Sequence, residues 1–141
     1  SLILKEELKN CKVISDDKIK SEILKKSIFA VAKSGTVSLE ICNFKIPSII
    51  IYKMNSLNFF IVKSLVKVKF ANIINIAANK EIIPELLQSK CNSKNIFNTV
   101  NALLNDKNSL NEQVMKTQEI IDKFRTNKSS EIASSVLLNN L

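Results

Sequence analysis

Short apolar runs alternate with amphipathic stretches through the first two thirds of the chain. Residues 28–32 are continuously apolar, and Ser48–Tyr52 form a second such run after Pro47, as in strands covered on both faces. Residues 11–14 and 70–74 predict two further strands. Because helical stretches separate these runs over short connections, we expect right-handed crossovers and a parallel sheet.

Apolar residues spaced three and four positions apart predict the helices. Asp16 and Asp17 offer N-cap oxygens at the start of one helix, and Ser109 and Glu112 form a capping box that predicts another helix start. The expected helices cover residues 2–9, 17–24, 36–43, 57–65, 96–104, 109–124 and 132–137.

The predicted fold class is therefore α/β, with a partial Rossmann-like parallel sheet, flanking helices and a helical C-terminal tail. Residues 1–88 would form the α/β layer and residues 89–141 the tail. A chain of 141 residues has room for one core, so both parts belong to a single, incomplete domain.

Composition places the chain among soluble globular proteins, because 45% of its residues are apolar and 24% are charged. The net charge is +8, and Arg125 is the single arginine among 21 basic residues. A surplus of Lys, Asn and Ile is also typical of AT-rich genomes. The charge therefore leaves two readings open, compositional drift and a basic surface for an anionic partner.

Several kinds of catalytic site are excluded by what the sequence lacks. Without histidine there is no Ser/His or Cys/His nucleophile pair. The three cysteines, Cys11, Cys42 and Cys91, are far apart and odd in number, so they fit reduced, buried thiols better than disulfides or a zinc site. Neither a G-x-G-x-x-G motif nor a P-loop is present.

The turn Ser34-Gly35-Thr36 lies where a predicted strand ends and a helix begins. Ligands of open α/β sheets bind at this edge, and unpaired amides at the helix start suit a diphosphate without a metal. The hydroxyls of Ser34 and Thr36 would donate to phosphate oxygens, and Glu40 would accept from vicinal sugar hydroxyls. The simpler reading is a turn relieved by glycine and a solvated Glu40.

A set of motifs from residue 28 to residue 88 resembles the C-terminal part of the lipid-A-disaccharide synthase family. The most specific pieces are the turn at residues 34–36 with Leu39-Glu40 and the run from Glu81 to Gln88. The other matching residues, in the same order and with compatible spacing, are Pro47, Ile51-Tyr52-Lys53, Leu65-Val66-Lys67-Val68 and Asn75.

The resemblance implies an inverting GT-B glycosyltransferase that needs neither a metal nor a cofactor. Its substrates would be UDP-2,3-diacylglucosamine and 2,3-diacylglucosamine 1-phosphate (lipid X), joined at the cytoplasmic face of the bacterial inner membrane in lipid A biosynthesis. Ser34, Gly35, Thr36 and Glu40 map to the UDP-binding turn, with Glu40 on the ribose. Asn75 maps to an asparagine of the active site.

The chain departs from the family pattern at two places and lacks other parts of the enzyme. Residues 72–75 lack the proline of the family's Ser-Leu-Pro-Asn stretch, and Lys80 stands where the family has arginine, so the phosphate clamp loses its bidentate fork. The N-terminal acceptor domain and the first strand of the C-terminal domain would lie upstream of Ser1. We therefore expect this fragment to be inactive alone.

Partners beyond the substrates follow from apolar and basic stretches. Residues 54–62 carry a dense apolar patch and precede Lys63, Lys67 and Lys69, which suits either an anionic membrane surface or packing against the sheet. The exposed sheet edge and the helical tail suit a homodimer with exchanged C-terminal elements. The apolar helix residues expected in the core or an interface are Phe97, Val100, Phe124 and Val136.

Two alternatives to this reading remain. One is another GT-B transferase with a different nucleotide sugar. The other is a non-catalytic basic module that binds nucleic acid or membrane through clustered lysines and the aromatic rings of Tyr52, Phe59, Phe60 and Phe70. Because the chain has one arginine and no recognisable RNA- or DNA-binding motif, we expect no nucleic-acid partner.

Overall fold

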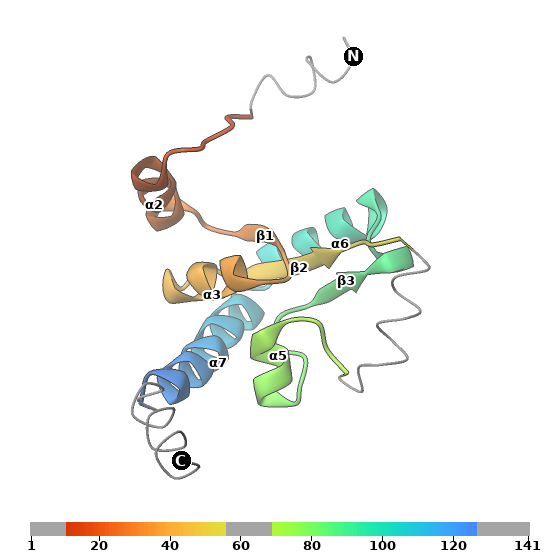
Figure 1. Cartoon of the computed structure of the whole chain (residues 1–141). Helices are drawn as coiled ribbons and strands as arrows, with labels where there is room; N and C mark the ends of the chain where they lie inside the picture. Colours follow the sequence, from red (N-terminus) through yellow and green to blue (C-terminus); the bar gives the residue numbers. More distant parts are fainter. Residues whose placement is uncertain (1–10, 56–68, 127–141) are drawn as a thin grey trace, which may run out of the picture.

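A three-stranded parallel sheet forms the centre of the computed structural model, which describes residues 11–55 and 69–126 (Figure 1). The strands are β1 (Ala30–Lys33), β2 (Ser48–Tyr52) and β3 (Glu85–Leu87), adjacent in that order. The helices are α2 (Asp17–Lys26), α3 (Thr36–Asn43), α5 (Ile73–Ala78), the 3-10 turn η1 (Gln88–Lys90), α6 (Ser93–Asn105) and α7 (Lys107–Thr126). The helices expected at residues 2–9, 57–65 and 132–137 lie outside the described residues.

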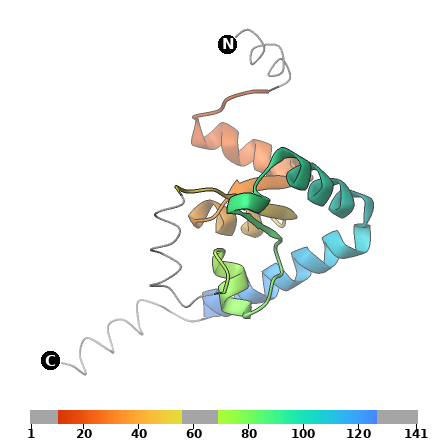
Figure 2. The ribbon, with the colours of Figure 1, turned by 90° about the vertical axis from the view of Figure 1, so that its right-hand side faces the viewer.

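One face of the sheet carries the core. Ala32 of β1 and Ile50 of β2 are register partners, and both belong to a buried cluster with Ile41 of α3 and Ile121 of α7. Figure 2 shows α6 and α7 meeting at one side of the molecule and diverging around the strands. The expected α/β architecture with a helical C-terminal part is confirmed by these elements.

The strand β1 is less covered than its apolar sequence predicts. Val31 is 47% exposed and Ile28 is 79% exposed, so β1 is buried on the core face alone. The prediction of two covered faces is therefore wrong for β1. It holds for Ile49 and Ile50 of β2, which have no exposed surface, because β2 lies between two strands whereas β1 forms an edge of the described sheet.

Two predicted strands are absent from the described structure. Residues 11–14 are irregular, and Val13 is fully exposed because no neighbouring strand pairs with this segment. In residues 70–74, Asn72 accepts from the amide of Ile74 at 2.9 Å and caps α5, so the chain enters a helix. The third strand is instead Glu85–Leu87, which the pattern did not predict.

The start of α7 also differs from the predicted capping box. The helix begins at Lys107, and the carboxylate of Asp106 accepts from the amides of Asn108 and Ser109 and from the Ser109 hydroxyl. These hydrogen bonds, led by that from the hydroxyl, lower the pKa of Asp106. Asp106 is a better cap than Ser109 because a carboxylate accepts several donors and complements the helix dipole.

The buried amide of Gln113 joins α7 to the sheet. Its oxygen accepts from the amide of Ser48 at 2.7 Å, and its nitrogen donates to the carbonyls of Ser48 at 3.1 Å and Ile82 at 3.4 Å. Phe97 is 68% exposed and Phe124 is 43% exposed, so neither is part of the core. Val100 is half-buried, and Val136 lies outside the described residues.

Candidate functional site

The turn between β1 and α3 lies at the carboxyl edge of the sheet. Gly35 is the residue before the helix. Its backbone angles are φ 142° and ψ −165°, a conformation that residues with a Cβ rarely adopt. Apart from Gly35 and its two chain neighbours, no heavy atom of the described residues lies within 4 Å of the place where a Cβ would stand. Glycine is therefore required by the backbone conformation rather than by crowding, and the space beside it is open.

Unpaired backbone amides at the start of α3 make this turn suitable for binding an anion. Gly35, Thr36 and Val37 are all exposed, and no side chain caps the helix. Within the described residues, the N–H groups of Thr36 and Val37 make no hydrogen bond. Two unpaired donors at the positive end of α3 suit an anionic oxygen ligand.

The two hydroxyl residues of the turn are used differently from each other. The Ser34 hydroxyl donates to the carbonyl of Ala71 at 2.6 Å, so its proton is already used inside the protein. The expectation that Ser34 donates to phosphate thus conflicts with its hydrogen bond in this structure. Thr36 is exposed, and its hydroxyl makes no hydrogen bond within the described residues.

A buried network of polar side chains, made of Ser38, Asn72 and Glu85, holds the turn on its inner side. The Ser38 hydroxyl donates to the Gly35 carbonyl at 2.6 Å and accepts from the side-chain amide of Asn72 at 2.9 Å. Glu85 accepts from the backbone amides of Ala71 at 2.8 Å and Asn72 at 2.9 Å. The sequence analysis missed this network; its one visible signal is a glutamate directly before Leu86-Leu87.

Asn75 is fully buried, and its side-chain amide is saturated. Its nitrogen donates to the Ile83 carbonyl at 2.7 Å and to Glu85 at 2.8 Å, while its oxygen accepts from the amides of Ile82 and Ile83. No donor or acceptor remains for a substrate in this structure. The predicted place of Asn75 in the active site stays a prediction, and its contacts indicate an indirect role.

Glu40 lies one turn into α3 and faces α2. Its Oε2 atom lies 2.7 Å from Nζ of Lys20, and both side chains are partly exposed. The hydrogen bond that the Lys20 ammonium donates to Glu40 is the main cause that raises the pKa of Lys20. The structure therefore brings Glu40 near the Gly35 turn along one helix, while an ion pair engages one of its two oxygens.

No hydrogen bond or ion pair joins the Lys80 side chain to the turn within residues 11–55 and 69–126. Lys80 follows Asn79, which ends α5 in the left-handed conformation, whereas the Gly35 turn is linked to the start of that helix. The pKa of Glu112 on α7 is lowered by the hydrogen bond from Lys116 first, and Lys80 also contributes. Lys80 is thus grouped with α7, and its assignment to a phosphate remains a prediction without a supporting contact.

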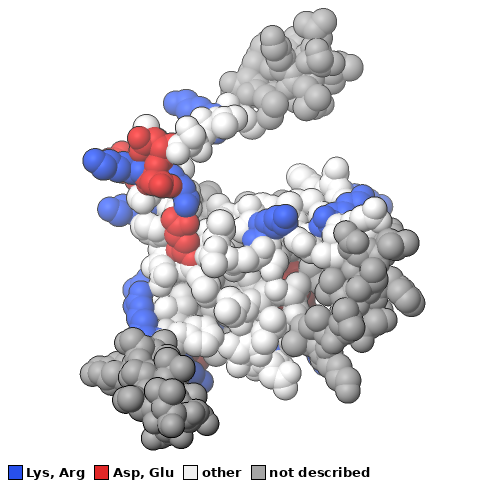
Figure 3. Space-filling model, viewed as in Figure 1, with Lys and Arg blue, Asp and Glu red and all other residues white. Residues whose placement is uncertain are grey.

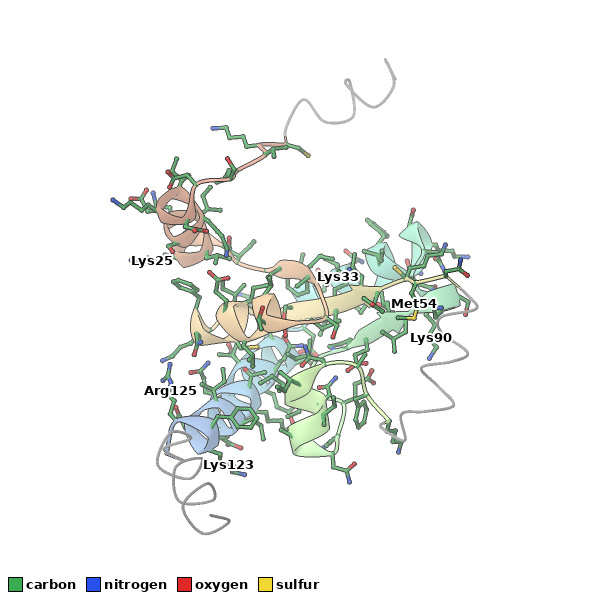
Figure 4. All side chains as sticks on the ribbon, viewed as in Figure 1. Lys25, Lys33, Met54, Lys90, Lys123 and Arg125 are labelled. Carbon is green, nitrogen blue, oxygen red and sulfur yellow. The ribbon has the colours of Figure 1, made fainter. Side chains whose placement is uncertain are left out.

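A second feature of the carboxyl edge was also missed. A cavity of about 300 Å³ is lined by Lys33, Ile51, Tyr52, Lys53 and Cys91. The Lys33 ammonium lies 5.1 Å from the centre of the Tyr52 ring, within cation–π range. Figure 4 shows Lys33, Met54 and Lys90 following one another along this side of the sheet.

Charged side chains are dispersed over the face seen in Figure 3, with basic and acidic groups together on α2. Within residues 11–55 and 69–126, no group of three His, Cys, Asp or Glu side chains converges as in a metal site. Among the described helices, none combines the length and apolarity that a transmembrane helix requires.

Comparison with known proteins agrees with the resemblance in the sequence. The family described as Lipid-A-disaccharide synthetase matches residues 2–138. The lipid-A-disaccharide synthase of Rickettsia canadensis is 38% identical over 138 residues, which cover 96% of this chain and 35% of that protein. The synthase of Rickettsia felis is 42% identical over 77% of this chain and 28% of that protein. The synthase of Sulfurihydrogenibium is 38% identical over 120 residues, which cover 85% of this chain and 31% of that protein. The chain spans about a third of these relatives.

Proposed function

Because the chain belongs to the lipid-A-disaccharide synthase family, we propose that it is the nucleotide-sugar-binding portion of such a glycosyltransferase. The observation that carries this proposal is the pair of unpaired, exposed amides at Thr36 and Val37, beside open space at Gly35. In this proposal residues 1–141 are a single, incomplete domain, with an α/β layer to residue 88 and a helical tail beyond it.

The proposed ligand is UDP, or a UDP-sugar, with its diphosphate at the Gly35 turn. The amides of Thr36 and Val37 donate to the phosphate oxygens, the Thr36 hydroxyl adds a third donor, and the helix dipole favours the negative charge. Glu40 accepts from the ribose hydroxyls through the oxygen that Lys20 leaves open.

The chemical contribution of this portion is stabilisation of the leaving group. When the bond between the sugar and the diphosphate breaks, negative charge grows on UDP, and donors already aimed at the phosphates stabilise it. Inverting transfer also needs a base at the acceptor hydroxyl. We assign that base and the acceptor site to the part of the enzyme beyond this third, so the chain alone makes no product.

The structure gives Asn75 contacts that support a role in this proposal, whereas it gives Lys80 none at the turn in the part of the chain that it describes. We propose that Asn75 acts as a positioning residue, because its four hydrogen bonds hold residues 82, 83 and 85. The place of Lys80 at a phosphate stays a prediction, because no hydrogen bond or ion pair joins its side chain to the Gly35 turn within the described residues.

The proposed substrates are UDP-2,3-diacylglucosamine and lipid X, and the proposed location is the cytoplasmic face of the inner membrane. Family membership supports these assignments. The homodimer with exchanged C-terminal elements is likewise a proposal, supported by the exposure of Phe97 on α6 and of Val31 on the edge strand. The membrane contact predicted for residues 54–62 lies mainly outside the described residues.

Calorimetric titration with UDP tests the proposal, with ADP as a matched nucleoside diphosphate. We expect saturable binding of UDP and weaker binding of ADP. A parallel titration with single-stranded DNA at two salt concentrations tests the basic-module alternative. Strong, salt-dependent DNA binding without any binding of UDP would overturn the proposal in favour of that alternative.

A further inference from the structure

One buried carboxylate receives three N–H donors from the loop and helix start at residues 71–75. Oε2 of Glu85 accepts from the Ala71 amide at 2.8 Å, and Oε1 accepts from the Asn72 amide at 2.9 Å and the Asn75 side chain at 2.8 Å. Glu85 is 9% exposed and stands at the first position of β3, in register with Ile50.

Glu85 is buried without a basic partner among the described residues. An isolated buried carboxylate is costly, and apolar residues would form a strand start at lower cost. The three donors compensate that cost and in return are fixed by the rigid sheet. The loop that follows the end of the undescribed segment 56–68 is therefore attached to β3 through Glu85.

Two hydrogen-bonded paths lead from this loop to the Gly35 turn. The Ala71 carbonyl accepts from the Ser34 hydroxyl at 2.6 Å. The Asn72 side chain donates to the Ser38 hydroxyl at 2.9 Å, which donates to the Gly35 carbonyl at 2.6 Å. The turn is thus held on both sides of Gly35 by two consecutive residues whose backbone Glu85 binds.

The second path sets the direction of a proposed ligand donor. The Gly35 carbonyl and the Thr36 amide belong to one planar trans peptide unit, in which the C=O and the N–H point in opposite directions. Because the Gly35 carbonyl is held toward Ser38 inside the protein, the Thr36 N–H points outward. The backbone N–H of Ser38 donates to the same carbonyl at 3.1 Å, so the hydroxyl adds a second hydrogen bond that restrains this peptide plane beside a glycine.

We propose that Glu85 is a positioning residue for the nucleotide-binding turn, which it holds in its binding conformation through Ala71, Asn72 and Ser38. This inference rests on the proposed function, because it explains how the amides that bind the diphosphate are pre-organised. Pre-organised donors bind more strongly since less ordering is required when the ligand arrives.

The test uses Glu85→Gln, which keeps size and shape. A glutamine offers one oxygen and one NH₂ group, so at least one loop donor meets another donor. Glu119→Gln, on an exposed residue of α7, is the matched control for loss of one negative charge. Ser38→Ala removes the second path alone and remains informative if Glu85→Gln fails to fold.

Two measurements keep this inference separate from the proposed function. In the ligand-free protein, ¹⁵N relaxation should show that the Gly35 and Thr36 amides are more mobile in Glu85→Gln and Ser38→Ala than in the wild type. Glu119→Gln should show wild-type mobility at both amides. UDP affinity should fall about tenfold in each of the first two variants. Their combined effect should be smaller than the sum of the two, since both act on one path.

Wild-type amide mobility in both Glu85→Gln and Ser38→Ala would overturn the inference, as would wild-type UDP affinity or fully additive losses in the double variant. If the wild-type chain binds no UDP, the proposed function fails. The relaxation experiment then still decides whether Glu85 holds the turn.

Discussion

The carboxylate of Glu40 on α3 and the ammonium of Lys20 on α2 lie 2.7 Å apart and join the two helices. Figure 1 shows α2 standing to one side of the molecule, above α3. The ion pair fixes the acid proposed for the ribose and leaves its second oxygen open. It also means that α2 is attached beside the proposed ligand.

Replacement of this acid tests its role in ligand binding. We expect Glu40→Ala to weaken UDP binding by about tenfold or more, because charge-assisted hydrogen bonds contribute roughly 1.5–3 kcal/mol each. Calorimetry on Glu40→Ala and on Glu22→Ala, an exposed acid of α2, makes the comparison. Equal affinities of both variants for UDP would remove Glu40 from the site.

The same ion pair predicts a pH dependence. The pKa of Lys20 is raised above its ordinary 10.5, first by the hydrogen bond that its ammonium donates to Glu40. A raised lysine pKa means that the pair stabilises the fold below pH 10.5 and that this contribution is lost as the pH rises through the higher folded value. Both side chains are partly exposed, so the effect on the free energy of unfolding of the whole protein is small.

Cleavage of α2 by a protease provides the measurement. We expect faster cleavage of the wild type once the pH exceeds the raised pKa of Lys20. In Lys20→Met, which lacks the ion pair at every pH, we expect faster cleavage than in the wild type already at neutral pH. Lys18→Met, on the same helix, is the control. Slow cleavage of Lys20→Met would show that the ion pair does not hold α2.

Asn75→Asp tests the buried network through its own titration. The substitution places a second carboxyl group against Glu85 and removes the donor to the Ile83 carbonyl. We expect a loss of stability of about 3 kcal/mol or more at neutral pH, because the buried Ile83 carbonyl and the buried Glu85 carboxylate both lose the donor that Asn75 supplies.

The sign of the pH effect follows from the like charges. Repulsion raises the pKa of the new carboxyl group in the folded protein, so its protonation at low pH relieves the loss. Urea unfolding should therefore show a smaller deficit at about pH 5 than at about pH 8. A deficit that grows as the pH falls would contradict the network described here.

The cysteines should differ sharply in reactivity. Burial raises the pKa of the Cys42 thiol to about 11, whereas Cys11 is exposed. Mass spectrometry after treatment of the folded protein with a maleimide should find Cys11 modified and Cys42 unmodified. Denaturant should make both react. Rapid modification of Cys42 without denaturant would place it outside the core.

Local signals explain which elements the sequence predicts. The strand β2 and the turn with α3 carry strong signals, an apolar run after Pro47 and a glycine directly before a helix. Residues 70–74 look like a strand until the contact of Asn72 with Ser38, 34 positions away, is known. The strand β3 is too short for a periodic pattern and depends on its pairing with β2.

The residues of the candidate site also differ in whether local sequence reveals them or only a distant contact does. Gly35, Thr36 and Glu40 are recognisable because their roles depend on neighbouring positions. Glu85 is not, since the partners of its carboxylate come from the loop and helix start ten or more residues earlier. The hydrogen bond from the Ser34 hydroxyl to Ala71 also depends on a distant contact that the sequence does not reveal, and the role of Ser34 at a phosphate stays a prediction.

The central claim is that the exposed amides after Gly35 bind the diphosphate of UDP. An NMR titration of the ¹⁵N-labelled chain with UDP, using uridine as the ligand without phosphates, tests it most directly. We predict that UDP shifts the Thr36 and Val37 amide resonances saturably and that uridine shifts them far less. UDP binding that leaves both resonances unchanged, or equal shifts with uridine, would contradict the claim.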